Sequence, residues 1–368
     1  MKINVYCYDD INNPQCGGGG AYREFEIHTL LSQNHTIKFY TGNFKNALDT
    51  SKPNFTHKHL GFKTNYTLSR LSFALFATIH SLFSKADIYA IPYSMYSPVV
   101  TFLFKNKKTV ILFFHITGQQ VFKKYGILGY IPHLAERLVL SHAANFITLT
   151  DSMAHDIQEK RPGAKVNAGY VSFDSDLISD KLTDSNYILC FGRIDIHMKG
   201  IDILIPAFEK ICPNFPDHQL IIAGRGIEKD IKWLKQRILD SKYNNRIKVV
   251  LNASSAEKKN LFHGATFVCM PSRFEGWNIA AIEAAASSKA TLGTRIHGLS
   301  DAIKENETGL LAEPENIEQL AKSMETLLSN SGLRNELGKN GYVWAQQFTL
   351  ERIAKIQEDF YSSVMNKQ

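Results

Sequence analysis

The feature of this sequence that most constrains its fold is a regular alternation of short apolar runs with helical patterns, which occurs twice. Continuous apolar runs separated by helices are typical of strands in a parallel sheet that is covered on both faces. In the first half such runs occupy residues 2–8, 36–42, 86–92, 108–116 and 145–150. After Asp174 the rhythm restarts, with runs at residues 186–193, 218–226, 246–252, 265–272, 289–294 and 308–313. The sequence therefore predicts an α/β fold with two doubly wound, Rossmann-like domains.

The length of the chain agrees with two domains, because 368 residues exceed what one ordinary core supports. We predict a first domain over residues 1–172 and a second over residues 173–349, with a last helix at about residues 350–368 that crosses back to the first domain. Residues 66–83 place Leu68, Leu71, Leu75, Ile79 and Leu82 on one helix face. In doubly wound sheets ligands bind at the carboxyl ends of the strands, so we expect the two domains to face each other across a cleft.

The charge of the chain is unevenly distributed. The net charge is +7, yet residues 1–172 carry 18 Lys and Arg against 10 Asp and Glu, whereas residues 173–368 carry 24 against 25. Lys105, Lys107 and Lys108, and also Lys123 and Lys124, stand near aromatic residues. Such a basic half suits an anionic membrane surface, a phosphorylated or lipid-linked acceptor, or nucleic acid; an ordinary soluble basic face is the alternative. The basic residues are scattered and no recognition module appears, so we expect no nucleic-acid partner.

The chain shows no targeting or membrane-spanning pattern. Its first residues lack the apolar run of a signal peptide, and no stretch approaches the ~18–20 apolar residues of a membrane span. The five cysteines have no metal-ligand or disulfide spacing. We therefore expect a cytoplasmic protein, with peripheral attachment to the inner face of the plasma membrane if the basic half binds lipid. Its oligomeric state is left open.

Two glutamates stand out in the segment VCMPSRFEGWNIAAIEAAASSKATLGT, residues 268–294. Glu275 and Glu283 lie eight residues apart in a run of small and apolar residues, where carboxylates need partners. A strand that ends at Met270 and a helix that begins after Asn278 would place Glu275 in the loop and Glu283 in the helix. The free N–H groups of such a helix end suit a phosphate, and the carboxylates suit sugar hydroxyls. The alternative is a capping glutamate followed by an exposed one.

A second motif lies in YILCFGRIDIHMKGIDILIPAFEKI, residues 187–211. Gly192 and Arg193 end a predicted strand, and Lys199 follows six residues later. Glycine lets a ligand approach the backbone, while the planar fork of Arg and the compact charge of Lys suit a diphosphate. Two unrelated surface cations are the alternative.

Together these motifs resemble the retaining glycosyltransferases of family 4, which carry an E-x7-E motif. The stretch FEGWNIAAIEAAASSK aligns with that motif without a gap. The resemblance implies the GT-B fold. It also implies that Glu283 binds the ribose hydroxyls of a nucleotide, while Glu275 and the amides around Gly276 and Trp277 hold the donor sugar and phosphate. Asn278 replaces a usual glycine, where its side chain would either crowd the donor or add a hydrogen bond to the sugar.

The same resemblance extends to other positions. It implies that Arg193 and Lys199, beside Gly192, stabilise the departing nucleoside diphosphate, and that the turn at Gly224 lies near the donor base. In the first domain, Gly19 and Gly20 belong to GGGGAYREFEIHTLL, which resembles the family's glycine-rich loop and first helix.

His115 ends an apolar run at the position where the family commonly has a histidine near the donor sugar; a satisfied core histidine is the alternative. Asp174 and Asp176 spell the Asp-x-Asp string that binds manganese in another transferase fold, but they lie at the domain junction, so we interpret them as a turn and expect no metal site. Residues 36–44 offer no acidic residue for a dinucleotide ribose, which argues against NAD. We expect no cofactor.

The resemblance implies a metal-independent glycosyltransferase (EC 2.4) that moves a sugar from a nucleotide-sugar donor, UDP-sugar being favoured over GDP-sugar, to a glycan or lipid-linked acceptor in cell-surface polysaccharide or glycoconjugate synthesis. Two alternatives remain. One is a nucleotide-sugar epimerase of similar shape, and the other is an inactive homologue that serves as a binding or scaffold subunit.

Overall fold

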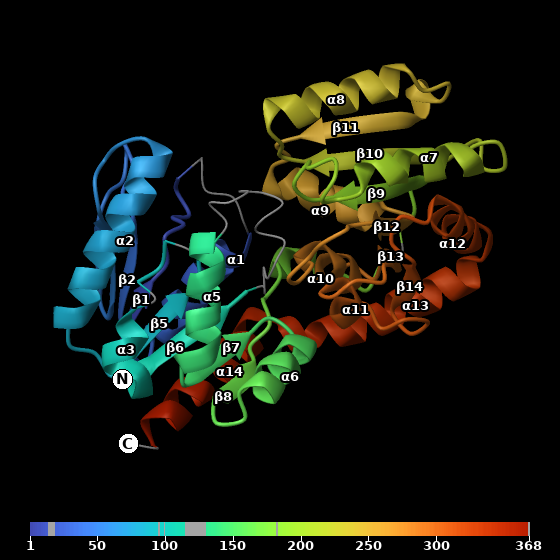
Figure 1. Cartoon of the computed structure of the whole chain (residues 1–368). Coiled ribbons are helices and arrows are strands. Elements are labelled where there is room, and N and C mark those ends of the chain that lie inside the picture. Colours follow the sequence, from blue (N-terminus) through green and yellow to red (C-terminus); the bar gives the residue numbers. More distant parts are fainter. Residues whose placement is uncertain (14–18, 95, 99, 115–129, 182, 367–368) are drawn as a thin grey trace. The chain divides into compact units, whose positions relative to one another are not determined.

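The computed structural model of the chain (Figure 1) describes residues 1–368 apart from residues 14–18, 95, 99, 115–129, 182 and 367–368. The side chains of residues 131 and 132 are likewise outside the description. The chain divides into two compact units, which are described separately. The first unit comprises Met1–Ser172 and Leu350–Gln368, and the second comprises Phe173–Thr349.

Within its described residues, the first unit contains an eight-stranded sheet in the order β3-β4-β2-β1-β5-β6-β7-β8. All neighbouring strands are parallel except the β3–β4 pair, which is antiparallel. The strands are β1 (Lys2–Tyr6), β2 (Thr36–Gly42), β3 (Thr50–Lys52), β4 (Phe55–Leu60), β5 (Ile88–Pro92), β6 (Thr109–Phe113), β7 (Asn145–Thr148) and β8 (Lys165–Ala168).

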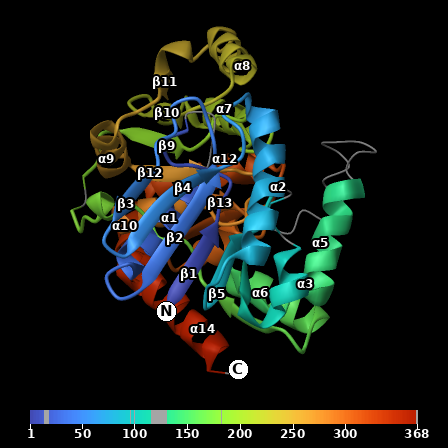
Figure 2. The same ribbon diagram turned by 90° about the vertical axis from the view of Figure 1, so that its left-hand side faces the viewer.

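Helices cover both faces of this sheet. Neighbouring residues of a strand point to opposite faces, and Phe39 contacts Phe25 of α1 whereas Tyr40 contacts His80 of α2. The helices α1 and α2 therefore lie on opposite faces, and Figure 2 shows α2 beside the strands. The helices of the unit are α1 (Gly19–Leu31), α2 (Tyr66–Phe83), α3 (Thr101–Lys105), the one-turn η1 (Asn106–Lys108), α5 (Tyr130–His142), α6 (Asp151–Lys160) and α14 (Leu350–Met365).

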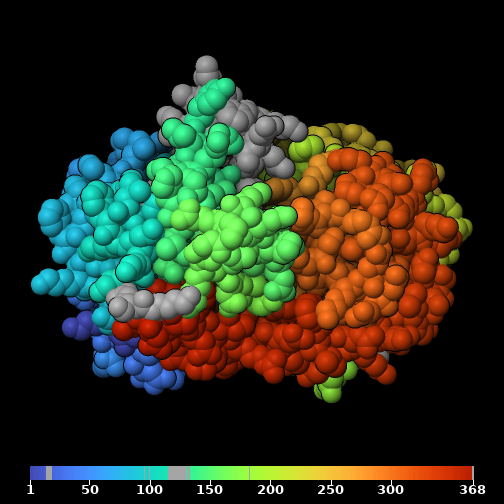
Figure 3. Space-filling view, turned by 60° about the horizontal axis from the view of Figure 1, so that its bottom comes forward, coloured from blue at the N-terminus to red at the C-terminus, as the bar shows by residue number. Residues whose placement is uncertain are grey.

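The C-terminal helix α14 packs against α1, although the two are more than 300 residues apart in sequence. In Figure 3 the red C-terminal segment lies against green residues of the first unit. Their contact contains a buried polar network. Gln357 Nε2 donates to Glu24 Oε1 over 3.0 Å, and Tyr361 Oη lies 3.2 Å from His28 Nε2. All four of these side chains are buried. Since an unpaired polar group is costly in such a place, the network fixes how α14 docks.

The second unit contains, within its described residues, a six-stranded sheet in the order β11-β10-β9-β12-β13-β14, and every neighbouring pair is parallel. The strands are β9 (Tyr187–Phe191), β10 (Gln219–Gly224), β11 (Ile247–Leu251), β12 (Phe267–Met270), β13 (Thr291–Thr294) and β14 (Gly309–Ala312). The helices are α7 (Ile201–Ile211), α8 (Glu228–Leu239), α9 (Ser255–Gly264), α10 (Ile279–Ala286), α11 (Leu299–Ala302), α12 (Ile317–Ser329) and α13 (Ser331–Ala345), with short turns η3 (Ser175–Leu177), η4 (Asn244–Arg246) and η5 (Gln346–Phe348). The predicted strand-and-helix alternation is thus confirmed.

Two features of the first unit differ from the expectation. The strands β3, β4 and β8 were not predicted. The helix α2 forms as predicted, but most of its apolar face points to solvent: Leu68, Leu71, Leu75 and Ile79 are 51%, 54%, 59% and 47% exposed. The face that packs on the sheet instead consists of mostly small residues, namely Ser69, Ser72, Phe73, Ala77 and Ser81. Among the described residues, no helix is both long and apolar enough to cross a bilayer.

Candidate functional site

A small pocket in the second unit lies where the strands β9, β10 and β12 end. It brings together both predicted motifs and is lined by Cys190, Phe191, Gly192, Arg193, Ile194, Lys199, Ile201, Ile222, Ala223, Met270, Ser272 and Asn278. The carboxyl ends of parallel strands are the usual place for ligands in open α/β sheets. Geometry alone therefore makes this pocket the candidate site of the unit.

Glycines let the backbone segments around the pocket approach one another. A Cβ atom on Gly224 would lie 1.6 Å from the carbonyl oxygen of Gly192, so a side chain is impossible there without moving the backbone. Gly200 has φ +64°, and its Cβ would lie 2.0 Å from the carbonyl oxygen of Pro271. This second approach brings the loop that carries Lys199 against the loop that follows β12.

Glu275 is held by three hydrogen-bond donors. Lys199 Nζ forms an ion pair with Oε1 of Glu275, and Ser272 Oγ and Asn278 Nδ2 donate to the same oxygen over 2.7 and 3.1 Å. The Glu275 side chain is only 10% exposed. A carboxylate held by a cation and two neutral donors keeps a fixed orientation.

Asn278, at the position where a glycine was expected, has two structural roles. Its Oδ1 accepts a hydrogen bond from the Ala281 amide over 3.0 Å, which caps the N-terminus of α10. Its Nδ2 donates to Glu275. The side chain thus lies in the pocket wall as a partner of Glu275.

Arg273 ties the two loops of the pocket together. Its amide donates to the Met198 carbonyl oxygen over 2.9 Å, and its guanidinium binds both oxygens of Asp202 over 2.7 and 2.9 Å. The same guanidinium also binds Glu315. Because Met198 directly precedes Lys199 and Arg273 lies two residues before Glu275, this contact helps to position that ion pair.

Arg193 differs from the other cations of the pocket. It is exposed, and no hydrogen bond or ion pair is recorded for its side chain within the described part of the chain. Its guanidinium can therefore meet an incoming anion without giving up a protein partner.

Glu283 lies inside α10, as predicted, and is 3% exposed. Its partner is Lys258 of α9, whose Nζ lies 2.5 Å from Glu283 Oε1 and 3.8 Å from Asp174 Oδ2. Lys258 also lies 5.7 Å above the ring of Phe191, which lines the pocket. Both glutamates of the motif thus carry a lysine partner. Lys258, Ser272 and Arg273 were not among the predicted site residues.

Other predicted residues have plainer surroundings. Trp277 is buried and packs its ring against Phe348, with 5.1 Å between ring centroids, so it anchors the loop in the core. The preceding peptide of Glu275 and Gly276 abuts Gly298, whose φ is +80° and whose Cβ would lie 2.7 Å from the Glu275 carbonyl oxygen. Cys190 lines the pocket as a thiol, because burial raises its pKa to about 12.

The remaining predicted residues lie in the first unit or at the start of the second, and the structure gives few contacts for them. Gly19 and Gly20 begin α1, and a Cβ on Gly20 would meet nothing within 4 Å. His115 lies outside the described residues, as do Lys123 and Lys124. Asp174 of the second unit accepts a hydrogen bond from the Asp176 amide over 3.2 Å and caps η3, as the turn interpretation predicts.

Comparisons with known proteins agree with this geometry. Residues 175–344 match the model of a family described as glycosyl transferases group 1. An uncharacterized glycosyltransferase of Methanocaldococcus jannaschii is 31% identical over 180 residues, which are 48% of this chain and 49% of that protein. The capsular polysaccharide biosynthesis glycosyltransferase CapM of Staphylococcus aureus is 22% identical over 276 residues, which are 70% of this chain and 71% of CapM. The chain spans about half the length of the first of these relatives.

Solved structures give the whole fold. Sucrose-phosphate synthase of Thermosynechococcus elongatus matches with a TM-score of 0.80 at 18% identity, and all of both chains is covered. The chain has the GT-B fold. Anabaena HepE in complex with UDP-glucose matches with a TM-score of 0.74 at 17% identity, over 99% of this chain and 100% of HepE. At such identities the similarity establishes the fold, while the family match is confined to the second unit.

Proposed function

We propose that this protein is a retaining glycosyltransferase of family 4, which transfers a sugar from a nucleoside-diphosphate sugar to a glycan or lipid-linked acceptor. The observation that carries the proposal is the pocket that joins Gly192, Arg193 and Lys199 to Glu275 at the carboxyl ends of three strands. The match of residues 175–344 to group 1 glycosyl transferases supports it, and so does the name of CapM for a role in cell-surface polysaccharide synthesis.

The charges of the pocket suit the departing group. In glycosyl transfer the bond from the sugar C1 to the diphosphate breaks, a bond from C1 to the acceptor oxygen forms, and the acceptor proton passes to the departing phosphate oxygen. Negative charge grows on the diphosphate, and cations accelerate the step when they bind it more strongly in the transition state. Arg193 is free to bind the diphosphate, and Lys199 turns toward it as its pairing with Glu275 loosens.

The carboxylates suit the sugars of the donor. In this proposal Glu283 accepts hydrogen bonds from the ribose hydroxyls, and Lys258 orients the buried carboxylate. Glu275 accepts from a hydroxyl of the transferred sugar. Both groups lie in the donor-binding unit, so they bind the donor and no two-carboxylate hydrolysis is implied. We propose UDP as the nucleotide, because HepE, of the same fold, was solved with UDP-glucose.

We also propose that the protein works in the cytoplasm and attaches to the inner face of the plasma membrane. The exposed face of α2 supports this, because a stripe of Leu68, Leu71, Leu75 and Ile79 on a helix without acidic residues suits an interfacial position. The nearby α3 exposes Leu103 and Phe104, which line a recess together with Lys85, Lys107 and Lys108. Lysines beside apolar side chains suit an anionic leaflet.

A thermal-shift screen with UDP-, GDP- and ADP-sugars tests the donor assignment. A donor that binds the folded state raises the melting temperature by mass action, and we expect the largest shift with a UDP-sugar. Glu283→Gln should reduce this shift, whereas Lys199→Ala should mainly slow turnover. Lys322→Ala is the matched control, because Lys322 is exposed on α12, which contributes no residue to the pocket lining.

The two alternatives give different outcomes. An epimerase would convert the donor sugar without an acceptor. An inactive scaffold homologue would bind no donor, or would bind one without transfer. If Glu283→Gln and Lys199→Ala both behave like the wild type, the assignment of the site is wrong.

A further inference from the structure

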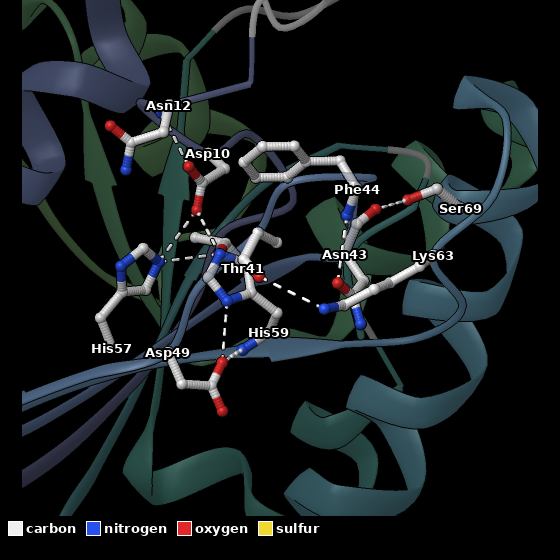
Figure 4. Close-up of polar contacts among 11 residues, drawn as sticks. Asp10, Asn12, Thr41, Asn43, Phe44, Asp49, His57, His59, Lys63 and Ser69 are labelled. Carbon is white, nitrogen blue, oxygen red and sulfur yellow. Dashed lines mark hydrogen bonds and ion pairs between the residues drawn. The ribbon is translucent and has the colours of Figure 1, made fainter.

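Three side chains of the first unit converge on one point, apart from the pocket described above. Asp10 Oδ2 lies 3.0 Å from His57 Nε2 and 2.9 Å from His59 Nε2 (Figure 4). The three potential ligand atoms all lie within 4.8 Å of one another. Asp10 and His57 are each 2% exposed, and the His59 side chain is 4% exposed. Polar groups this deeply buried need hydrogen-bond or ionic partners, because burying them without partners is costly.

The sheet places these residues together. His57 and His59 stand two apart on β4, so both point to the same face, and their register partners on β2 are Phe39 and Thr41. Asp10 lies in the connection that follows β1, and β1 is the neighbour of β2 in the sheet. The cluster is therefore at the carboxyl edge of the parallel strands, on the face covered by α1.

Outer contacts surround all three ligand residues, and Thr41 Oγ1 lies 2.8 Å from His57 Nε2. His59 Nδ1 lies 2.8 Å from Asp49 Oδ1, so Nδ1–H donates to that carboxylate. The Nε2 of the same ring lies 2.9 Å from Asp10 Oδ2, so His59 stands between two carboxylates. Asp10 is in turn fixed by the Asn12 amide over 2.7 Å and by Thr41 Oγ1 over 2.7 Å. Two carboxylates around one point favour positive charge there, which either a protonated ring or a bound cation supplies.

We propose that Asp10, His57 and His59 form a zinc site, with Asp49 as the outer carboxylate that orients His59. Two imidazoles and one carboxylate are zinc ligands, and bonds of about 2.0–2.1 Å place ligand atoms roughly 3.0–3.4 Å apart after a small expansion of the cluster. A carboxylate behind a ligating histidine is the usual supporting contact. A water completes the coordination, and the ion holds the connection from β1 toward α1 against β4.

Protonation is the alternative source of positive charge. A protonated His59 would pair with Asp10 and Asp49, and an N–H of His57 would donate to Asp10. In that state separate protons join the residues pairwise, whereas one ion would contact all three ligand atoms. The two states differ in metal content, which can be measured. The zinc proposal does not depend on the proposed glycosyl transfer, because the donor pocket lies in the other unit.

The test begins with full-length protein that has been stripped with a chelator. Titration with Zn²⁺ in a calorimeter should give one equivalent bound with a Kd below about 1 μM, and zinc should raise the melting temperature. Co²⁺ in its place should give the visible absorption of a tetrahedral site. Asp10→Asn and His59→Gln should weaken binding by at least a hundredfold.

Two further variants keep the test decisive if a ligand variant fails to fold. Asp49→Asn changes a half-exposed outer carboxylate and should weaken zinc binding by about 10–100-fold. His142→Gln removes an exposed histidine outside the cluster and should leave binding unchanged. The proposal is overturned if wild-type protein binds no stoichiometric zinc, or if Asp10→Asn, His59→Gln and Asp49→Asn all bind it like the wild type.

Discussion

Several carboxylates of this protein lie in apolar surroundings, and most of them are stabilised there by one or a few neighbouring side chains. Glu275 and Glu283 are each paired with a lysine, and Asp10 is surrounded by two histidines and a threonine. Glu24 in the α1–α14 contact is different. It is fully buried beside Gln357, with no cation of Lys or Arg among its recorded partners, and burial raises its pKa to about 7.

The neighbouring His28 has the opposite shift, because burial lowers its pKa to about 4. Between the ordinary pKa of Glu24, 4.5, and about 7, the folded state holds a proton that the unfolded state has lost, so the free energy of unfolding falls as pH rises. Between about 4 and 6.5 His28 binds a proton only in the unfolded state, so its contribution rises with pH. The two effects oppose each other below about pH 6.5, and the full penalty of Glu24 remains above pH 7.

Glu24→Gln should therefore stabilise the protein at high pH. At pH 8 the neutral amide removes a buried charge while keeping an oxygen for Gln357, and the melting temperature should rise by several degrees. At pH 5 the variant should melt close to the wild type. Differential scanning calorimetry at both values checks this, with Glu351→Gln, an exposed change on α14, as the control. An equal shift at the two pH values would contradict the assigned pKa.

The sequence identified the residues whose neighbours are close along the chain. The positions of Glu275, Asn278 and Glu283 follow from a strand, a loop and a helix that the pattern of apolar and small residues predicts. The lysine partner of Glu283 was missed because Lys258 lies on another helix, and one sequence does not reveal which of many surface lysines turns inward. For Asn278 the sequence left two effects on the donor open, namely crowding and an added hydrogen bond. Its contact with Glu275 was not predicted, because a sequence does not show how two side chains are oriented.

Among the helices and strands, the hydrophobic patterns misled where an element does not turn its apolar side chains toward the core. In β4 the inward positions after Phe55 are His57 and His59, so the apolar alternation that marks a strand is missing. Missing β4 meant missing the histidine pair. In α2 the periodicity was found, but an apolar stripe on a helix does not say whether it meets the core or a surface outside the protein.

The exposed stripe of α2 gives a prediction for membrane binding. Wild-type protein should float with anionic liposomes and lose this association as salt is raised. Replacing both Leu71 and Leu75 by Gln removes apolar area worth about 2 kcal/mol on burial, so binding should weaken by roughly tenfold or more. Leu48→Gln is the control, since Leu48 is 78% exposed in the first unit but not on α2.

Absence of any flotation with anionic liposomes would dismiss the membrane proposal. Flotation that the double change on α2 leaves intact would place the contact elsewhere on the protein.

For the whole molecule, the alternation of strands and helices was sufficient to predict the α/β class with two Rossmann-like domains, whereas the GT-B fold was implied by the resemblance of the two motifs. The physical reason is that buried parallel strands need continuous apolar runs, which are local features of a sequence. The docking of α14 against α1 was a hypothesis from its position alone. Its polar contacts, such as Gln357 with Glu24, join residues more than 300 positions apart and have no local signal.

The central claim is that the pocket of the second unit binds a nucleoside diphosphate through Arg193 and Lys199, with Glu283 on the ribose. A crystal structure of the protein soaked with UDP tests it most directly. We expect the diphosphate beside the Arg193 and Lys199 side chains and the ribose hydroxyls within hydrogen-bond distance of Glu283. UDP bound at another place, or an empty pocket at saturating UDP, would contradict it.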